Sequence, residues 1–367
     1  MNVLAVALDG NVIDKISWLA KWNPDIDWGV IGVSPDCLWE PLSWADSFDN
    51  LDCEYRETRS YPQEIRFGWQ DYSLFAYEAA CKSLSEPFLG HWFHYDIRAM
   101  LEGIGKLRNV LDKCSPDIVV IWGERGWYNE VVKDWVAAKG IPLCRLERSI
   151  FPGLYVADGT GLEQNNCELA YWFELMEPVT ESDYAHQADV LQTWLPLAQS
   201  SSVELQPRTT LGQVFSILDG RPAVFVPLQV PVDTNMVFRN GGYDNWTLLE
   251  YVQDNYYDHQ IIVKKHPGDG FTDEGVLQHY CDVYDLALVD MNTHAILPMV
   301  QKVVSINSQV IIEAWMYGKE VEVLGKPGFD LPSVSDKMSL LYTLRFAYYI
   351  EPFQLGERLR WIAAKHI

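Results

Sequence analysis

Two stretches decide the fold: HQIIVKKHPGD at residues 259–269 and VVSINSQVIIEAWMYGKEVEVLG at residues 303–325. Each begins with a short apolar run, typical of a buried parallel strand, and then reaches a polar turn. The second stretch continues from a serine cap at Ser308 into a helical pattern that Gly318 closes, and then into another apolar run. Because this order builds half of a nucleotide-binding sheet, the region predicts an α/β domain with a ligand site where its strands end.

The same alternation of strands and helices runs along most of the chain. Strand-like runs lie at residues 2–9, 28–33, 116–122, 141–147, 223–228, 260–265, 286–290, 303–306 and 321–324. Helical spacing is found at residues 12–22, 77–114, 127–139, 247–255, 296–301, 309–317 and 340–367. Alternation of this kind predicts parallel sheets with helices on their faces.

The length of 367 residues suits two domains. Residues 196–210, with a run of serines and Pro207, have the composition of a linker. We therefore expect a Rossmann-like domain at residues 1–205, a second Rossmann-like domain at 206–345, and a C-terminal helix at 346–367 that crosses back to the first. Two doubly wound domains with a cleft between them form the GT-B arrangement of an α/β protein.

Charge and hydropathy exclude several classes of protein. The formal net charge of −23 argues against a nucleic-acid partner, which requires a basic face. No apolar run approaches the roughly 18 residues of a membrane span, and the amino terminus lacks a basic start, so we expect a cytoplasmic protein with at most peripheral membrane contact. The last segment, with Arg358, Arg360 and Lys365, is the most basic candidate face. The seven cysteines form no CxxC pair and predict reduced thiols.

A phosphate-binding turn is the first candidate site. His266, Pro267 and Gly268 follow a strand at its carboxyl end, where open sheets bind ligands. His266 would donate a hydrogen bond to a phosphate oxygen, and Lys264 or Lys265 would neutralise its charge. The alternative is a solvated turn with a structural histidine.

The second turn supplies further candidates. Ser305, Asn307 and Ser308 precede a helix, whose free N–H groups suit a phosphate, although Ser308 could be a plain N-cap. Glu313 stands in an otherwise apolar helix. A carboxylate there could accept both hydroxyls of a ribose, or it could simply be an exposed polar residue.

Three acids are candidates for catalysis. Asp233 lies just past a strand end, while Glu147 and Asp158 come from the other half of the chain. Acids on opposed walls are used in glycosyl chemistry, one to attack or stabilise and one to relay a proton. Each could instead be an ordinary turn residue. We predict no metal site, because no Walker or DxD motif occurs and His91 and His94 lack a third ligand.

Taken together, these motifs resemble the bacterial Kdo transferases of capsule and surface-polysaccharide assembly. The family's Gln-x-x-x-Asp element is matched by Gln229–Asp233, and its Lys-x-His-Pro-Gly element by Lys264–Gly268. Its Asn-Ser-x-x-x-x-Glu-Ala element, with the glycines that follow, is matched by Asn307–Gly325.

In the first half of the chain the resemblance is looser. Leu146-Glu147 and the run from Pro152 through Asp158 are similar to the family's glutamate-glycine and proline-glutamate loops. Arg148 stands where the family has glycine, and Asp158 where it has glutamate. These departures leave open which of Glu147 and Asp158 is the acid/base.

The resemblance implies a GT-B fold and a retaining β-Kdo transferase of capsule polysaccharide or O-antigen lipopolysaccharide synthesis, without a cofactor or metal. Its donor would be CMP-Kdo, the cytidine monophosphate ester of the acidic sugar Kdo, and its acceptor a saccharide or lipid-linked glycan. Bacterial sialyltransferases have similar elements, so CMP-sialic acid is an alternative donor. A sugar-nucleotide epimerase or hydrolase, or a non-catalytic scaffold, could share the fold.

Overall fold

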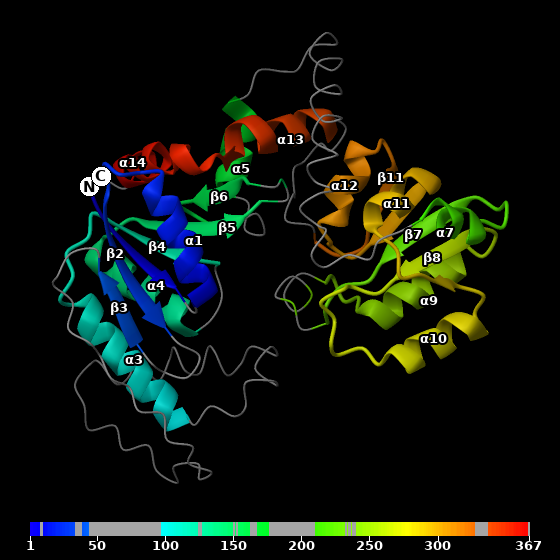
Figure 1. Ribbon diagram of the computed structural model, residues 1–367, viewed down its shortest axis with the longest axis horizontal. Coiled ribbons are helices and arrows are strands. Elements are labelled where there is room, and N and C mark those ends of the chain that lie inside the picture. The colour runs from blue at the N-terminus through cyan, green and yellow to red at the C-terminus, as the bar shows by residue number, and fades with distance from the viewer. Residues whose placement is uncertain are drawn as a thin grey trace. The chain divides into compact units, whose positions relative to one another are not determined.

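The computed structural model describes residues 1–7, 10–33, 39–43, 97–123, 127–149, 151, 153–161, 167–175, 210–231, 233, 236, 240–326 and 337–365. Its contacts divide the chain into two units. The first consists of Met1–Ser149, Gly153–Glu168 and Phe346–Ile367, and the second of Ile150–Pro152 and Leu169–Arg345. Both are built around a sheet with helices (Figure 1), which confirms the predicted α/β class with two Rossmann-like units. The predicted linker at 196–210 lies, except for Thr210, outside the described residues.

A seven-stranded sheet forms the centre of the first unit, in the order β12-β6-β5-β4-β1-β2-β3. Its strands are β1 (Asn2–Ala7), β2 (Asp27–Val33), β3 (Trp39–Ser43), β4 (Ile118–Trp122), β5 (Leu143–Arg148), β6 (Tyr155–Asp158) and β12 (Tyr349–Ile350). Strands β5, β4, β1 and β2 are parallel, whereas β3 pairs antiparallel with β2, and β6 pairs antiparallel with both β5 and β12. The helices of this unit are α1 (Gly10–Lys21), α3 (Ile97–Leu111), α4 (Trp127–Lys139) and α14 (Leu355–Lys365), with the 3-10 turn Pro352–Gln354 before α14.

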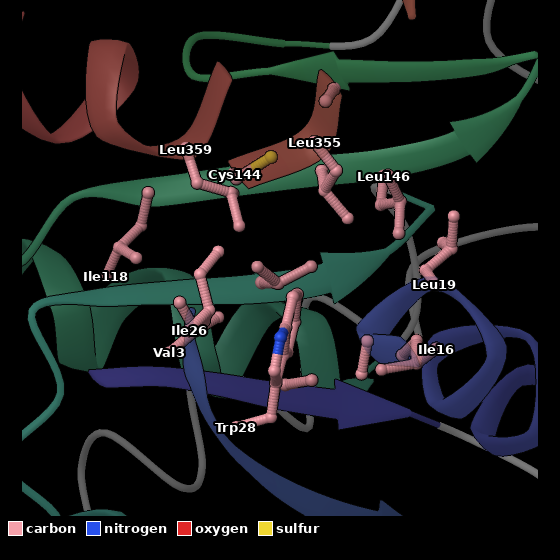
Figure 2. Packing of buried hydrophobic residues seen from close by; sticks show 14 of the residues in the cluster. Val3, Ile16, Leu19, Ile26, Trp28, Ile118, Cys144, Leu146, Leu355 and Leu359 are labelled. Atoms are coloured by element: carbon pink, nitrogen blue, oxygen red, sulfur yellow. The ribbon is translucent and has the colours of Figure 1, made fainter. Parts of the chain in front are cut away.

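Alternating side chains give this sheet two apolar faces. Leu4 and Val6 of β1 pack with residues of α3 and α4, while Val3 and Ala5 face α1 and α14. Figure 2 shows the second of these cores, in which Leu355 and Leu359 lie over β5 and β4. The apolar run of β1 is therefore buried on both sides, as expected for a central parallel strand.

The C-terminal segment is not one helix, and it belongs to the first unit only from Phe346 onward. It consists of α13 (Lys337–Thr343), a π-helical turn at Leu344–Tyr348, strand β12, and then α14. The single helix that the spacing predicts is wrong, because Pro352 has no N–H to donate and β12 pairs with β6. The predicted basic face is also wrong in its first residue, since the Arg358 side chain is buried and donates to the carbonyl of Ala347.

A five-stranded sheet, all parallel, forms the second unit in the order β11-β10-β7-β8-β9. Its strands are β7 (Ala223–Pro227), β8 (Gln260–Lys264), β9 (Ala287–Leu288), β10 (Lys302–Ser305) and β11 (Glu320–Val323). The helices are α7 (Leu211–Ser216), α9 (Asn245–Asn255), α10 (Glu274–Val283), α11 (Thr293–Ile296), the 3-10 turn Leu297–Met299, and α12 (Val310–Met316). Helix α5 (Cys167–Leu175) begins in the first unit and ends in the second.

Two cores again cover the two faces of this sheet. Val224 and Val226 of β7 pack with α9 and α10, while Phe225 packs with α11, the 3-10 turn and α12. The predicted strands and helices of residues 223–324 are present within one to three residues at most ends. Helix α10 is the exception, since no helix was expected at Glu274–Val283.

Asn23 joins the two helices that cover one face of the first sheet. Its side-chain amide donates to the carbonyls of Leu19 and Pro352, and its Oδ1 accepts from the N–H of Gly356 at 2.8 Å. The side chain is buried, so water cannot replace these bonds.

We predict that Asn23→Ala lowers the free energy of unfolding by about 2–4 kcal/mol, because three buried polar groups lose their partner. Chemical denaturation measures this loss. Lys21→Ala, an exposed neighbour, is the control and should change stability by less than about 0.5 kcal/mol. Equal stabilities of the two variants would show that the Asn23 bonds do not hold the helices together.

Candidate functional site

The candidate site lies where the strands of the second sheet end. Strand β7 is flanked by β8 on one side and by β10 on the other, so the strand order changes direction at β7. A crevice forms at such a switch point, outside the carboxyl ends of the strands. The last residues of β8 and β10, together with the segments that follow β7, β8 and β10, contain nine of the eleven candidate site residues of the sequence.

Gln229 fills the switch point. Its side-chain amide donates to Asn307 Oδ1 at 2.8 Å and its Oε1 accepts from the N–H of Asn307. The backbone of Gln229 makes two further bonds with the Asn245 side chain at the start of α9. Gln229 therefore ties the ends of β7 and β10 together, a role that the sequence motif alone does not reveal.

The turn after β8 orients the ring of His266. The N–H of Gly268 donates to His266 Nδ1 at 3.0 Å. Since Nδ1 accepts this bond, the neutral ring carries its proton on Nε2, which is then the donor. A Cβ at position 268 would lie 3.3 Å from Nδ1, so glycine lets the backbone come close to the ring. Pro267 and Gly268 are exposed and shape the turn.

His266 is neutral near pH 7. Protein atoms around the ring and the nearby Lys264 charge lower its pKa below the usual 6.5, although the residue as a whole is exposed. Asp233 and Asp269 act in the opposite direction and raise the pKa of His266. The structure thus brings the predicted residues Asp233, Lys264 and His266 into one electrostatic neighbourhood.

Lys264 itself is buried. It ends β8 with 5% of its surface exposed, and its Nζ donates to Thr293 Oγ1 at 3.2 Å. Desolvation lowers the pKa of Lys264, while Glu313 and Asp290 raise it. Lys265 is directed elsewhere, because its Nζ donates to the carbonyl of Thr272.

Glu313 lies in α12 with its carboxyl group inside the protein. Its Oε2 is buried and has no hydrogen-bond partner in the described part of the chain. Burial raises the pKa of Glu313 to about 7, and the charge of Lys264 partly opposes this. The alternative prediction, that Glu313 is an exposed polar residue, is wrong, because its Oε2 is buried.

The serines before α12 make local bonds. Ser305 is fully buried and its Oγ accepts from the N–H of Ser308, whose own Oγ accepts from Val310. The N-cap of α12 is Gln309, one residue later than predicted. Asn307 and Ser308 remain partly exposed, so of this group they are the ones that a ligand can reach.

Three residues beside Lys264 were not expected from the sequence. Thr293 holds its ammonium group, and His294 and Tyr317 form a buried pair with Tyr317 Oη 3.3 Å from His294 Nδ1. Desolvation, followed by the charge of Lys264, lowers the pKa of His294 to about 4. The polar run Asn292-Thr-His294 after an apolar stretch was the available signal.

The two acids from the first unit differ in what they can do. Asp158 is completely buried; its Oδ1 accepts from Thr160 and Gly161, and its Oδ2 from the Tyr348 hydroxyl. This burial and these bonds favour a structural role for Asp158, and its role as acid/base stays a prediction. Glu147, near the end of β5, is partly exposed, and its Oε1 accepts from the N–H of Arg148.

Two further observations concern the described residues as a set. Within them, no three His, Cys, Asp or Glu side chains are grouped as metal ligands. None of the described helices combines the length and the apolar character that crossing a membrane requires.

Two buried groups of this site titrate in opposite senses. The pKa of Glu313 rises from 4.5 to about 7 on folding, so the unfolded chain ionises first and stability falls as pH rises across this window. The pKa of His294 falls from 6.5 to about 4, so stability is lost as pH falls across that window. Between pH 4.5 and 6.5 the two effects offset each other.

Glu313→Gln removes the first effect. At about pH 8 the variant should be more stable than wild type by on the order of 1–3 kcal/mol, and the gain should vanish near the ordinary glutamate pKa of about 4.3. Denaturant unfolding at several pH values measures the gain, with the exposed Glu250→Gln as control. A gain that is independent of pH would contradict the buried state of Glu313.

Known proteins offer the following comparisons. Residues 206–345 match the family described as "Capsule polysaccharide biosynthesis protein". No curated protein sequence matches the chain significantly.

Solved structures with a similar fold include two from Thermosulfurimonas dismutans, KpsC beta Kdo 2,7 transferase and KpsC beta Kdo 2,4 transferase. The first is 18% identical, with a TM-score of 0.47, over 70% of this chain and 88% of that one. The second is 15% identical, with a TM-score of 0.48, over 68% and 87%. A UDP-GlcNAc 2-epimerase from Methanocaldococcus jannaschii is 12% identical, with a TM-score of 0.39, over 100% of both chains.

The matched segment contains the second unit from α7 to α13, and with it the turns after β7, β8 and β10. It is the part in which the motifs resemble the capsule family. Over residues 206–345, the chain is similar to the capsule polysaccharide biosynthesis proteins.

Proposed function

We propose that this protein is a glycosyltransferase that moves Kdo from CMP-Kdo to a hydroxyl of a saccharide or lipid-linked glycan. One observation carries the proposal: the exposed His266, with a donor at Nε2, and the unsatisfied buried oxygen of Glu313 lie in the same unit, in segments that follow parallel strands. Such a pair complements the two polar parts of a nucleotide, its phosphate and its ribose.

The CMP part would bind to the second unit alone. His266 Nε2–H would donate to a phosphate oxygen, and the N–H groups and side chains of Asn307 and Ser308 would offer further contacts. Glu313 would accept the ribose hydroxyls, which satisfies its orphaned oxygen. The capsule family match supports a sugar nucleotide as ligand, and the motif resemblance supports CMP-Kdo as the donor.

Asp233 would act on the sugar. Its charge is felt at the His266 ring, so it stands beside the proposed phosphate position. In a retaining mechanism its carboxylate attacks the anomeric carbon, the bond to CMP breaks, and CMP leaves with the electron pair on its phosphate oxygen. The acceptor hydroxyl then attacks the same carbon, releases Asp233, and gives its proton to a base. Glu147 is the better candidate for this base, because Asp158 is enclosed.

Incubation with CMP-Kdo tests the proposal directly. We expect CMP release that depends on a saccharide acceptor and survives EDTA, since His266 and the turn donors would neutralise the leaving group. Release without acceptor would indicate a hydrolase, loss on chelation a metal enzyme, and absence of both binding and release a scaffold. CMP-sialic acid serves as the competing donor. If transfer from it were faster than transfer from CMP-Kdo, the donor would be CMP-sialic acid.

Asp233→Asn should bind CMP as wild type does, yet transfer at least about 100-fold more slowly, a loss of about 2.7 kcal/mol of transition-state stabilisation. Calorimetry and a transfer assay separate the two effects. The control is Asp254→Asn, an exposed position on α9 that should leave both unchanged. Near-normal transfer by Asp233→Asn would remove Asp233 from this role.

A further inference from the structure

Lys264 does not lie where a lysine that binds a phosphate would be expected. It shares the face of β8 with Ile262, which packs in the core beneath α11 and α12. Only 5% of its surface is exposed, and Thr293 Oγ1 accepts from its Nζ at 3.2 Å. His266, two residues further on, is exposed in the turn. The Lys264 ammonium group therefore lies inside the protein, whereas the His266 imidazole lies at the surface.

Glu313 lies on α12 one turn before Tyr317, whose hydroxyl is 3.3 Å from Nδ1 of His294, the residue that follows Thr293. Its Oε2 is enclosed without a hydrogen-bond partner in the described part of the chain. A buried carboxylate is costly unless a charge or donor compensates it. Among the described residues, Lys264 is the charge that opposes the desolvation of Glu313.

The other titratable groups leave this relation intact. Asp290 acts on Lys264 and favours its charged form. His294 and His266 both feel the Lys264 charge, and both have a pKa below the usual histidine value. Near pH 7 both rings are neutral, so Lys264 supplies the positive charge of this region.

We infer that Lys264, whose Nζ donates to Thr293, is a positioning residue that favours the anionic form of Glu313 for binding the ribose hydroxyls of the nucleotide. It does not touch the phosphate. The inference rests on the proposed function, which assigns a nucleotide to this site. An ionised carboxylate only accepts hydrogen bonds and has two oxygens to do so, which suits a vicinal diol.

Ligands that lack one part of CMP separate the two roles of a lysine. If Lys264 bound the phosphate, its loss would weaken CMP but spare cytidine. If Lys264 acts through Glu313, its loss weakens CMP and cytidine by the same factor and spares 2′,3′-dideoxycytidine. Cytidine also has no phosphate that titrates near pH 7, so its affinity reports Glu313 more simply.

The variants are Lys264→Met, Thr293→Val and the conservative Thr293→Ser, with Lys265→Met as the matched neighbour. Calorimetry should show that Lys264→Met lowers the affinity for cytidine about fivefold at pH 7, because a rise of about one unit in the Glu313 pKa from about 7 lowers its ionised fraction from about one half to about one tenth. The affinity should recover at higher pH, where Glu313 ionises again. Thr293→Val should show a smaller loss in the same direction, and Thr293→Ser and Lys265→Met should resemble wild type.

A titration without ligand decides the charge relation independently. Carbon-13 NMR of labelled glutamate carboxyls, assigned with Glu313→Gln, should show a higher pKa for Glu313 in Lys264→Met and Thr293→Val. An unchanged Glu313 titration in both variants, or a loss of affinity for CMP but not for cytidine, would overturn the inference. If wild type binds neither ligand, the proposed function and the ribose role fail together, and the titration still tests the pairing of Lys264 with Glu313.

Discussion

Parallel pairing of β7 with both β8 and β10 is the constraint on which the candidate site depends. It places the ends of three strands at one edge of the sheet, where open α/β sheets bind their ligands. Gln229 then links the ends of β7 and β10 through two bonds to Asn307. Without this pairing, the turn of His266 and the helix of Glu313 would have no common edge.

Burial gives the side chains at this edge different tasks. The turn leaves His266 exposed, while the pleat of β8 directs Lys264 into the protein. Glu313 has an oxygen without a partner and a pKa raised to about 7, which is a cost to stability. A ligand that supplies hydroxyl groups would remove this cost. The unpaired oxygen therefore lowers the stability of the free protein and favours binding of the ligand.

Much of this arrangement is predictable from the sequence because it follows local rules. Apolar runs in the sequence predict β7 and β8. Gly318, with a φ of 67°, ends α12 as expected for a left-handed C-cap. Helix α10 was missed because it buries only Leu277 and Cys281, too few apolar residues for a pattern. The enclosure of Asp158 could not be predicted, since its partner Tyr348 is 190 residues away. The burial of Lys264 follows from alternation with Ile262, but its neighbours Thr293 and Glu313 arise from tertiary packing.

A crystal structure of the protein with CMP measures the central claim most directly. The account predicts a phosphate oxygen at hydrogen-bond distance from His266 Nε2 and ribose hydroxyls at the same distance from Glu313, about 2.7–3.2 Å in each case. It also predicts that Lys264 Nζ stays on Thr293 and away from the phosphate. CMP bound elsewhere, or held without any contact to Glu313, would contradict the account.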